Sequence, residues 1–138
     1  MTTTKANSQA QHIDALARTL WGESRGEGRK GMEAVAATVM NRVRDPRRWP
    51  NNVTAVVKQP RQFSAWNASD PNRPLMQRVT EADRHFRMAL EIAERALEGT
   101  LKDPTNGANH FHTHAVSPSW SRGKQPVKII GNHRFFRL

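Results

Sequence analysis

Two runs of apolar residues with helical spacing constrain the fold of this chain more than any other feature. The first run predicts a helix that ends near Ser24, where Gly22 and Gly26 weaken it. The second predicts a helix over residues 28–44 that Pro46 closes. The apolar positions of these runs are Ile13, Leu16, Ala17, Leu20, Met32, Val35, Ala36, Val39, Met40 and Val43. Together they predict a helical core built early in the chain.

Two more helices follow from local start and stop signals. Asn52 is placed to cap a short helix. A longer helix is predicted over residues 81–98, with a capping box formed by Thr80 and Asp83 and with Gly99 as its C-terminal cap. Its apolar residues predict one face turned toward the core.

The remaining segments lack helical spacing. Residues 61–75 predict a loop or a short strand, and residues 108–116 and 127–138 predict short strands. With 138 residues, the chain is long enough for one compact domain. We therefore predict an α+β fold, mostly helical, with a small antiparallel sheet toward the C-terminus. The domain is expected over residues 10–138, after a disordered tail at residues 1–9.

Composition narrows the function classes. The chain has 22 Lys and Arg against 12 Asp and Glu, a net charge of +10, which favours polyanionic partners. Cysteine is absent, which excludes disulfides, a thiol nucleophile and thiolate metal ligands. The polar first residues contain no apolar segment typical of a signal peptide, and no stretch is apolar enough to span a membrane. We expect a monomer without stable membrane insertion.

Glu23 is the candidate general acid. It follows Leu16 by seven residues, so it extends the buried stripe if the helix persists. A carboxyl group in apolar surroundings has a raised pKa and can donate a proton near neutral pH. The alternative is a solvated helix end paired with Arg25 or Arg29. Glu27 is predicted to cap the next helix or form a salt bridge, and it is the candidate second acid of a glycosidase pair.

Three histidines allow two interpretations. His110, His112 and His114 share one face if their segment is a strand. They could hold zinc with a ligand from elsewhere. They could equally line a polar groove. The second interpretation, with no metal and no cofactor, is our prediction.

Several motifs in a fixed order resemble a known family. The stretch LARTLWGESRGEGRKGMEAVAATVMNRV resembles the opening of the SleB-type, spore cortex-lytic cell wall hydrolase domain. Along the whole chain, the elements that match this family are residues 22–27, 41–43, 62–64, 103–108 and 130–135. The resemblance extends over residues 11–138, although the His-rich segment departs from the spore enzymes.

This resemblance implies a lysozyme-like catalytic domain that cleaves peptidoglycan between N-acetylmuramic acid and N-acetylglucosamine. Such enzymes are often lytic transglycosylases that leave a 1,6-anhydro end. The family's catalytic glutamate carries over to Glu23 as general acid and base. The predicted substrate contacts are Glu27, Gln62, Phe63, Ser64, Trp66, His110, His112 and Trp120.

Other functions remain open from sequence alone. A muramidase would use water with Glu23 and Glu27. A zinc-dependent N-acetylmuramoyl-L-alanine amidase would use His110, His112 and His114. A basic nucleic-acid-binding module would rest on charge, with Trp66 and Trp120 stacking on bases; the motif order favours sugars over nucleic acid. A domain of this composition fits a phage endolysin, kept in the host cytoplasm before it reaches the periplasm and the wall. Its partners would be peptidoglycan and, through the basic surface, anionic lipopolysaccharide.

Overall fold

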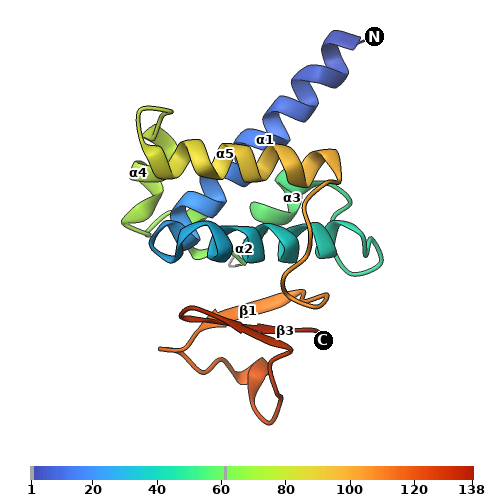
Figure 1. Ribbon diagram of the computed structural model, residues 1–138, viewed down its shortest axis with the longest axis vertical. Helices are drawn as coiled ribbons and strands as arrows, with labels where there is room; N and C mark the ends of the chain where they lie inside the picture. Colours follow the sequence, from blue (N-terminus) through green and yellow to red (C-terminus); the bar gives the residue numbers. More distant parts are fainter. Residues whose placement is uncertain (1, 61) are drawn as a thin grey trace.

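The computed structural model describes residues 2–60 and 62–138, with helices stacked across one another and a small sheet packed beneath α2 (Figure 1). The α-helices are α1 (Thr2–Ser24), α2 (Gly28–Val43), α3 (Val53–Val57), α4 (Asn72–Arg78) and α5 (Arg84–Glu98). The 3-10 helices are η1 (Arg25–Glu27), η2 (Ser64–Trp66) and η3 (Ser119–Ser121). The strands are β1 (His110–Thr113), β2 (Lys128–Ile130) and β3 (His133–Phe136).

The helical core forms where α1, α2 and α5 pack together. Leu16 and Leu20 of α1, Val35 and Val39 of α2 and Ile92 of α5 are all fully buried in one cluster. Their burial confirms the two apolar stripes predicted for α1 and α2. Burial of such side chains is the dominant favourable term in folding, so these stripes fix the relative placement of the helices.

Several helix ends lie where the sequence predicts them. α1 ends at Ser24. The side chain of Asn52 accepts a hydrogen bond of 2.8 Å from the Ala55 N–H at the start of α3. Gly99 closes α5 with φ of 80°, a left-handed conformation that favours glycine.

Two local predictions are wrong. α5 begins at Arg84 because Asp83 is its N-cap, accepting a hydrogen bond of 3.0 Å from the Phe86 N–H. The predicted capping box at Thr80 therefore does not form. The second is the expectation of a loop or a short strand over residues 61–75, because residues 72–75 begin helix α4. Pro74 lies in the first turn of α4, where its missing N–H leaves no helical hydrogen bond unmade.

The N-terminal segment also differs from expectation. Helix α1 includes residues 2–9, where the sequence predicts a disordered tail, and these residues contain no glycine or proline that would break a helix. Met1 lies outside the described residues. Across the described chain, no helix has both the length and the apolar character needed to cross a bilayer.

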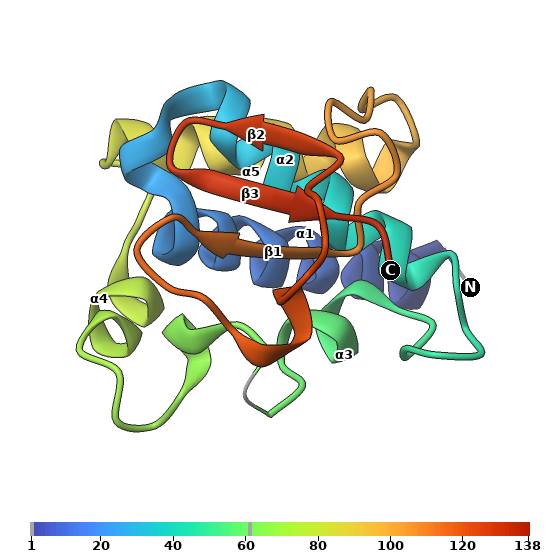
Figure 2. The same ribbon diagram turned by 90° about the horizontal axis from the view of Figure 1, so that it is seen from below.

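The sheet has the order β1-β3-β2, with both pairs antiparallel, and lies across the helices (Figure 2). Phe135 of β3 is buried with Ala34 of α2 and Ala108, which fixes the inner face of the sheet against α2. In β1, His110 and His112 alternate with Phe111, which packs against Phe135. The two histidines therefore lie on the outer face. This arrangement confirms the predicted α+β fold.

Candidate functional site

Glu23 lies in the last turn of α1, one residue before the helix ends. Its side chain is partly buried, and one carboxylate oxygen accepts a hydrogen bond of 3.4 Å from the Ala65 N–H of η2. The end of α1 and the η2 segment thus hold this acid between them. It lies where the sequence predicts, at the end of the buried stripe.

The surroundings of Glu23 favour its protonated form. Burial is the largest effect and raises the pKa of Glu23 to about 6. The Asp70 carboxylate raises the pKa further, and hydrogen bonds from the Ala65 and Ser64 backbone lower it. A carboxyl group with this pKa is protonated in part near neutral pH and can serve as a general acid.

Gly22 permits the close approach of α1 to η2 and α4. A Cβ at this position would lie 2.8 Å from the Cβ of Ala65 and 3.0 Å from the Sδ of Met76. Both neighbours are fully buried and have little room to move. The glycine next to the acid is therefore required by packing.

We expect Gly22→Ala to lower the free energy of unfolding by about 1–3 kcal/mol through overpacking. Activity is expected to fall as well, because the Ala65 N–H would be displaced from Glu23. Denaturant unfolding and peptidoglycan digestion measure the two effects. The matched control is Gly26→Ala, since a Cβ at Gly26 meets nothing within 4 Å. Equal stability of the two variants would contradict the packing argument.

Glu27 anchors the hairpin between β2 and β3. One oxygen of its carboxylate accepts a hydrogen bond of 2.9 Å from the Asn132 N–H, and the His133 Nδ1 lies 3.1 Å from the same oxygen. His133 is buried, and burial lowers its pKa despite the nearby carboxylate. Gly131 brings the hairpin backbone against this carboxylate, since a Cβ there would lie 3.1 Å from its oxygen. Glu27 therefore joins η1 to the sheet.

We expect Glu27→Ala to reduce the free energy of unfolding by about 1–3 kcal/mol, because it leaves the Asn132 N–H and the buried His133 without their acceptor. Glu27→Gln keeps an oxygen at this place and is expected to lose less. Thermal unfolding of the two variants makes the comparison. An equal loss in both would show that the charge, and not the acceptor, stabilises the hairpin.

Arg42 is a buried residue of this region whose contacts the sequence did not reveal. Its guanidinium donates hydrogen bonds to the Asn109 carbonyl (2.7 Å) and to the Gln62 side-chain oxygen (3.0 Å). Burial lowers the pKa of Arg42 to about 10. The ring of Phe63 lies against this guanidinium and is 1% exposed. Of the three substrate contacts predicted in this segment, Gln62 and Ser64 expose their side chains, whereas the Phe63 ring is part of the core.

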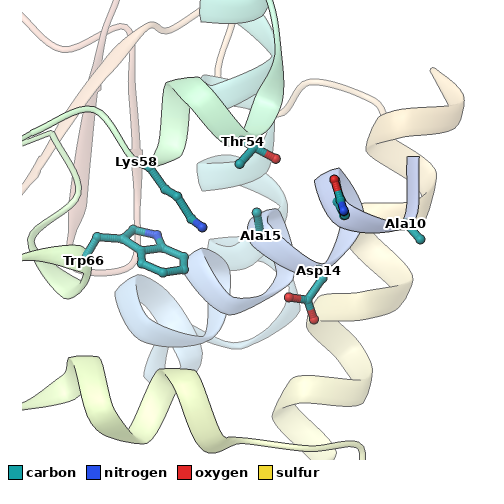
Figure 3. Close-up of a pocket in the computed structure, with 7 residues that line it drawn as sticks. Ala10, Asp14, Ala15, Thr54, Lys58 and Trp66 are labelled. Atoms are coloured by element: carbon teal, nitrogen blue, oxygen red, sulfur yellow. The ribbon is translucent and has the colours of Figure 1, made fainter. Parts of the chain in front are cut away.

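Trp66 borders a pocket of about 410 Å³ beside α1 (Figure 3). Its indole N–H donates a hydrogen bond of 2.8 Å to the Thr19 hydroxyl, and the Lys58 ammonium lies 4.8 Å from the ring centroid. Thr54 and Asp14 also line the pocket, and Glu23 does not. The indole thus connects the η2 segment, which holds Glu23, with a separate pocket that Glu23 does not line.

The predicted histidine contacts belong to a second cluster on the outer face of the sheet. His110 lies between the rings of Trp49 and Trp120, and burial lowers its pKa to about 4. His112 stacks on Phe136, with ring centroids 5.2 Å apart, and meets the edge of Trp120. Trp120 therefore packs against the rings of both histidines.

The three histidines do not form a metal site. His110 packs between two indoles, and His114 lies just after β1 with an exposed side chain. Within residues 2–60 and 62–138, no group of three His, Asp or Glu side chains is placed to hold a metal ion. The zinc interpretation thus loses its structural basis.

Two interactions near Glu23 were not predicted from the sequence. One is between Asp70 and Glu23, and the other joins Asn72 to Asp70 and Arg25. Asp70 is close enough in space to raise the pKa of Glu23. Its side chain also accepts a hydrogen bond of 2.8 Å from the Asn72 N–H, and the Asn72 oxygen accepts one of 3.1 Å from Arg25. These contacts link the start of α4 to η1, two residues after Glu23. Asp70 lies far from Glu23 and Arg25 in the sequence, so no local pattern predicts these contacts.

A partly buried carboxyl group with a raised pKa, such as Glu23 at the end of α1, is suited to general acid–base catalysis. Comparison with known proteins specifies the family. Residues 26–136 match the Cell Wall Hydrolase family, and the chain belongs to it. The match begins just after Glu23.

Full-length relatives are spore cortex-lytic enzymes. That of Halalkalibacterium halodurans is 32% identical over 127 residues, which cover 89% of this chain and 34% of the relative. That of Bacillus subtilis is 32% identical over 124 residues, covering 89% of this chain and 36% of the relative. The chain thus spans little more than a third of the length of these two relatives.

Solved structures confirm the fold. The catalytic domain of the Bacillus cereus SleB protein superposes with a TM-score of 0.72 at 30% identity, covering 91% of this chain and 89% of that domain. The catalytic domain of the germination-specific lytic transglycosylase SleB from Bacillus anthracis gives a TM-score of 0.71 at 31% identity, covering 91% and 93%. Most of the chain therefore superposes on the catalytic domains of these two proteins.

Proposed function

We propose that this chain cleaves the glycan strand of peptidoglycan between N-acetylmuramic acid and N-acetylglucosamine as a lytic transglycosylase. The observation that carries the proposal is the partly buried Glu23, with a pKa raised to about 6, held by the Ala65 N–H. Membership of the Cell Wall Hydrolase family and the similarity to a lytic transglycosylase domain support the substrate and the reaction.

The mechanism requires one proton donor that later accepts a proton. Glu23 donates its proton to the glycosidic oxygen as the bond to the muramic anomeric carbon breaks. The muramic 6-hydroxyl then attacks that carbon, and the Glu23 carboxylate accepts the hydroxyl proton. The products are an N-acetylglucosamine end with a free 4-hydroxyl and a 1,6-anhydro muramic end. Atoms and protons balance without a cofactor.

Three exposed or partly exposed groups near Glu23 are proposed to contact the glycan. Ser64 and Gln62 offer polar side chains on the segment that carries Ala65. Trp66 offers an indole surface beside the pocket of Figure 3, suited to pack against a sugar ring. His110, His112 and Trp120 remain predicted contacts on the sheet side.

Hydrolysis by water is the second candidate reaction, and Asp70 favours it. An inverting or retaining glycosidase needs a second carboxylate near the acid. Glu27 is occupied with the hairpin through its contacts to Asn132 and His133. Asp70 instead acts electrostatically on Glu23, which makes it the better candidate for a second acid.

The decisive test is digestion of purified peptidoglycan followed by mass measurement of the released muropeptides. We expect products one water lighter than those of a hydrolytic muramidase, unchanged by a chelator. Hydrated reducing ends would replace the transglycosylase proposal with the Asp70-assisted hydrolysis. Release of stem peptides that a chelator prevents would refute both.

We further propose phage host lysis as the biological setting, with the enzyme in the host cytoplasm until the membrane opens. The charge of +10 supports attraction to anionic envelope polymers, including lipopolysaccharide. Expression in bacteria should leave the cells intact until a membrane-permeabilising agent is added, after which turbidity should fall. Lysis without permeabilisation would contradict this setting.

A further inference from the structure

A polar pocket of about 460 Å³ lies on the outer face of the sheet, apart from the residues around Glu23. One wall is formed by β1 and β3, and the other by the loop that follows η3. We call it the basic pocket. Its lining includes six side chains that can donate a hydrogen bond or carry positive charge: His112, His114, Ser117, Arg122, Lys124 and Arg134.

The basic pocket concentrates positive charge. Arg134 is exposed and flanked in β3 by two buried residues, which places its side chain on the outer face opposite His112. Arg122 and Lys124 extend from the loop, which turns at Gly123 with φ of 73°. No Asp or Glu lines the pocket. In the part of the chain that the structure describes, none of these three cations belongs to an ion pair.

The loop that carries two of these cations is held in place. Trp120 of η3 packs edge-on against Phe136, with ring centroids 5.3 Å apart. Ser121 is buried, and its hydroxyl donates a hydrogen bond of 2.7 Å to the Pro118 carbonyl. The Lys124 N–H donates one of 3.1 Å to the Ser121 carbonyl. Anchoring of this kind reduces the entropy lost when a ligand binds.

We propose that the basic pocket binds a phosphate group carried by an envelope polymer or lipid. Two guanidinium groups and an ammonium around one hollow can surround a tetrahedral anion with several charge-assisted hydrogen bonds. A carboxylate is planar and is fully engaged by a single guanidinium fork, so it would use fewer of these donors. The hydroxyl of Ser117 adds a neutral donor. The three cations of this site are not among the proposed glycan contacts, although the pocket shares His112 with them.

Titration with inorganic phosphate, followed by backbone amide NMR, tests the site. Saturable shifts are expected at residues 112–117, 121–124 and 134. The triple variant Arg122→Gln, Lys124→Gln, Arg134→Gln should weaken phosphate binding at least tenfold. A control triple with the same net charge, Lys30→Gln, Arg78→Gln, Lys102→Gln, removes exposed cations elsewhere and should change it less than twofold. Equal weakening in both triples, or tighter binding of acetate than of phosphate, would overturn the proposal.

Two further ligands identify the source of the phosphate. Vesicles of a phosphate-free glycolipid with diphosphoryl lipid A are compared with the same vesicles containing dephosphorylated lipid A. Soluble poly(glycerol phosphate) is compared with polygalacturonate, a carboxylate polymer. At least tenfold preference for either phosphate-bearing member, lost in the pocket triple, supports the proposal and names the source. Equal binding within both pairs refutes it. Glu23→Gln should bind as the wild type does, so failure of the catalytic proposal leaves this test intact.

Discussion

Glu23→Gln is expected to reduce peptidoglycan cleavage by about 10²–10⁴-fold, the range that general acid–base catalysis typically contributes. Glutamine keeps an oxygen that can accept the Ala65 hydrogen bond, so the geometry of the site should persist. It cannot donate the proton that the glycosidic oxygen needs. Turbidity loss of permeabilised cells and quantified muropeptides measure the effect.

The matched control for this loss is Glu94→Gln, which removes an exposed carboxylate from α5. It makes the same change of charge far from the reacting groups and should leave the rate within twofold. Full activity of Glu23→Gln would show that Glu23 is not the general acid, and Asp70 would then be the next candidate.

Stability distinguishes chemical loss from unfolding in the same variant. The folded-state pKa of Glu23 is about 6, above its ordinary value of 4.5, so ionisation is harder in the folded protein. Wild-type stability therefore falls as pH rises through this window. At pH 7–8 the Gln variant escapes this penalty and should be more stable by about 1–2 kcal/mol. Near pH 4 the two proteins should have similar stability.

A pH–rate profile is the second large effect. Because the proposed acid must be protonated in the free enzyme, kcat/KM should decrease above pH 6, approaching tenfold per pH unit. The profile should be recorded on soluble glycan fragments at constant ionic strength. A rate that rises steadily from pH 6 to 9 would mean that an ionised group, and not a protonated Glu23, starts the reaction.

Asp70→Asn tests the cause of this profile. The Asp70 charge raises the pKa of Glu23, so its removal should move the decrease in kcat/KM to lower pH. Asparagine keeps the oxygen that accepts the Asn72 N–H, so the start of α4 should hold. If Asp70 instead supplies a second acid for hydrolysis, the variant should lose activity at every pH.

Local patterns predicted the elements of this fold well because their signals lie within a few residues. The spacing of Leu16 and Leu20 placed α1 and, with it, the position of Glu23. Asn52 and Gly99 marked helix ends through their own side chain or conformation. α5 was placed too early because both Thr80 and Asp83 are suitable caps, and only the folded chain selects between them.

The surroundings of the acid were less predictable because they depend on contacts between distant segments. Nothing in the sequence shows whether the Phe63 ring belongs to the core or binds a sugar. In the folded protein, the ring packs against Arg42 and Phe111 and is buried. Glu27 looked like a helix cap, yet its partners lie in the last hairpin. Alternation on a strand correctly placed His110 and His112 on one face, but it could not predict that aromatic rings would surround them.

The hydrogen bond between the Asn132 N–H and the Glu27 carboxylate joins an early and a late segment of the chain, so it forms late in synthesis. These residues are 105 positions apart, so the hairpin can reach η1 only after Asn132 has left the ribosome. All five α-helices, by contrast, are synthesised before residue 99. A chain interrupted before Asn132 would contain the acid and its helical scaffold without the strand that completes the sheet. We therefore expect wall-degrading activity to appear only after the hairpin has been synthesised and has joined η1, later than the helical scaffold that holds Glu23.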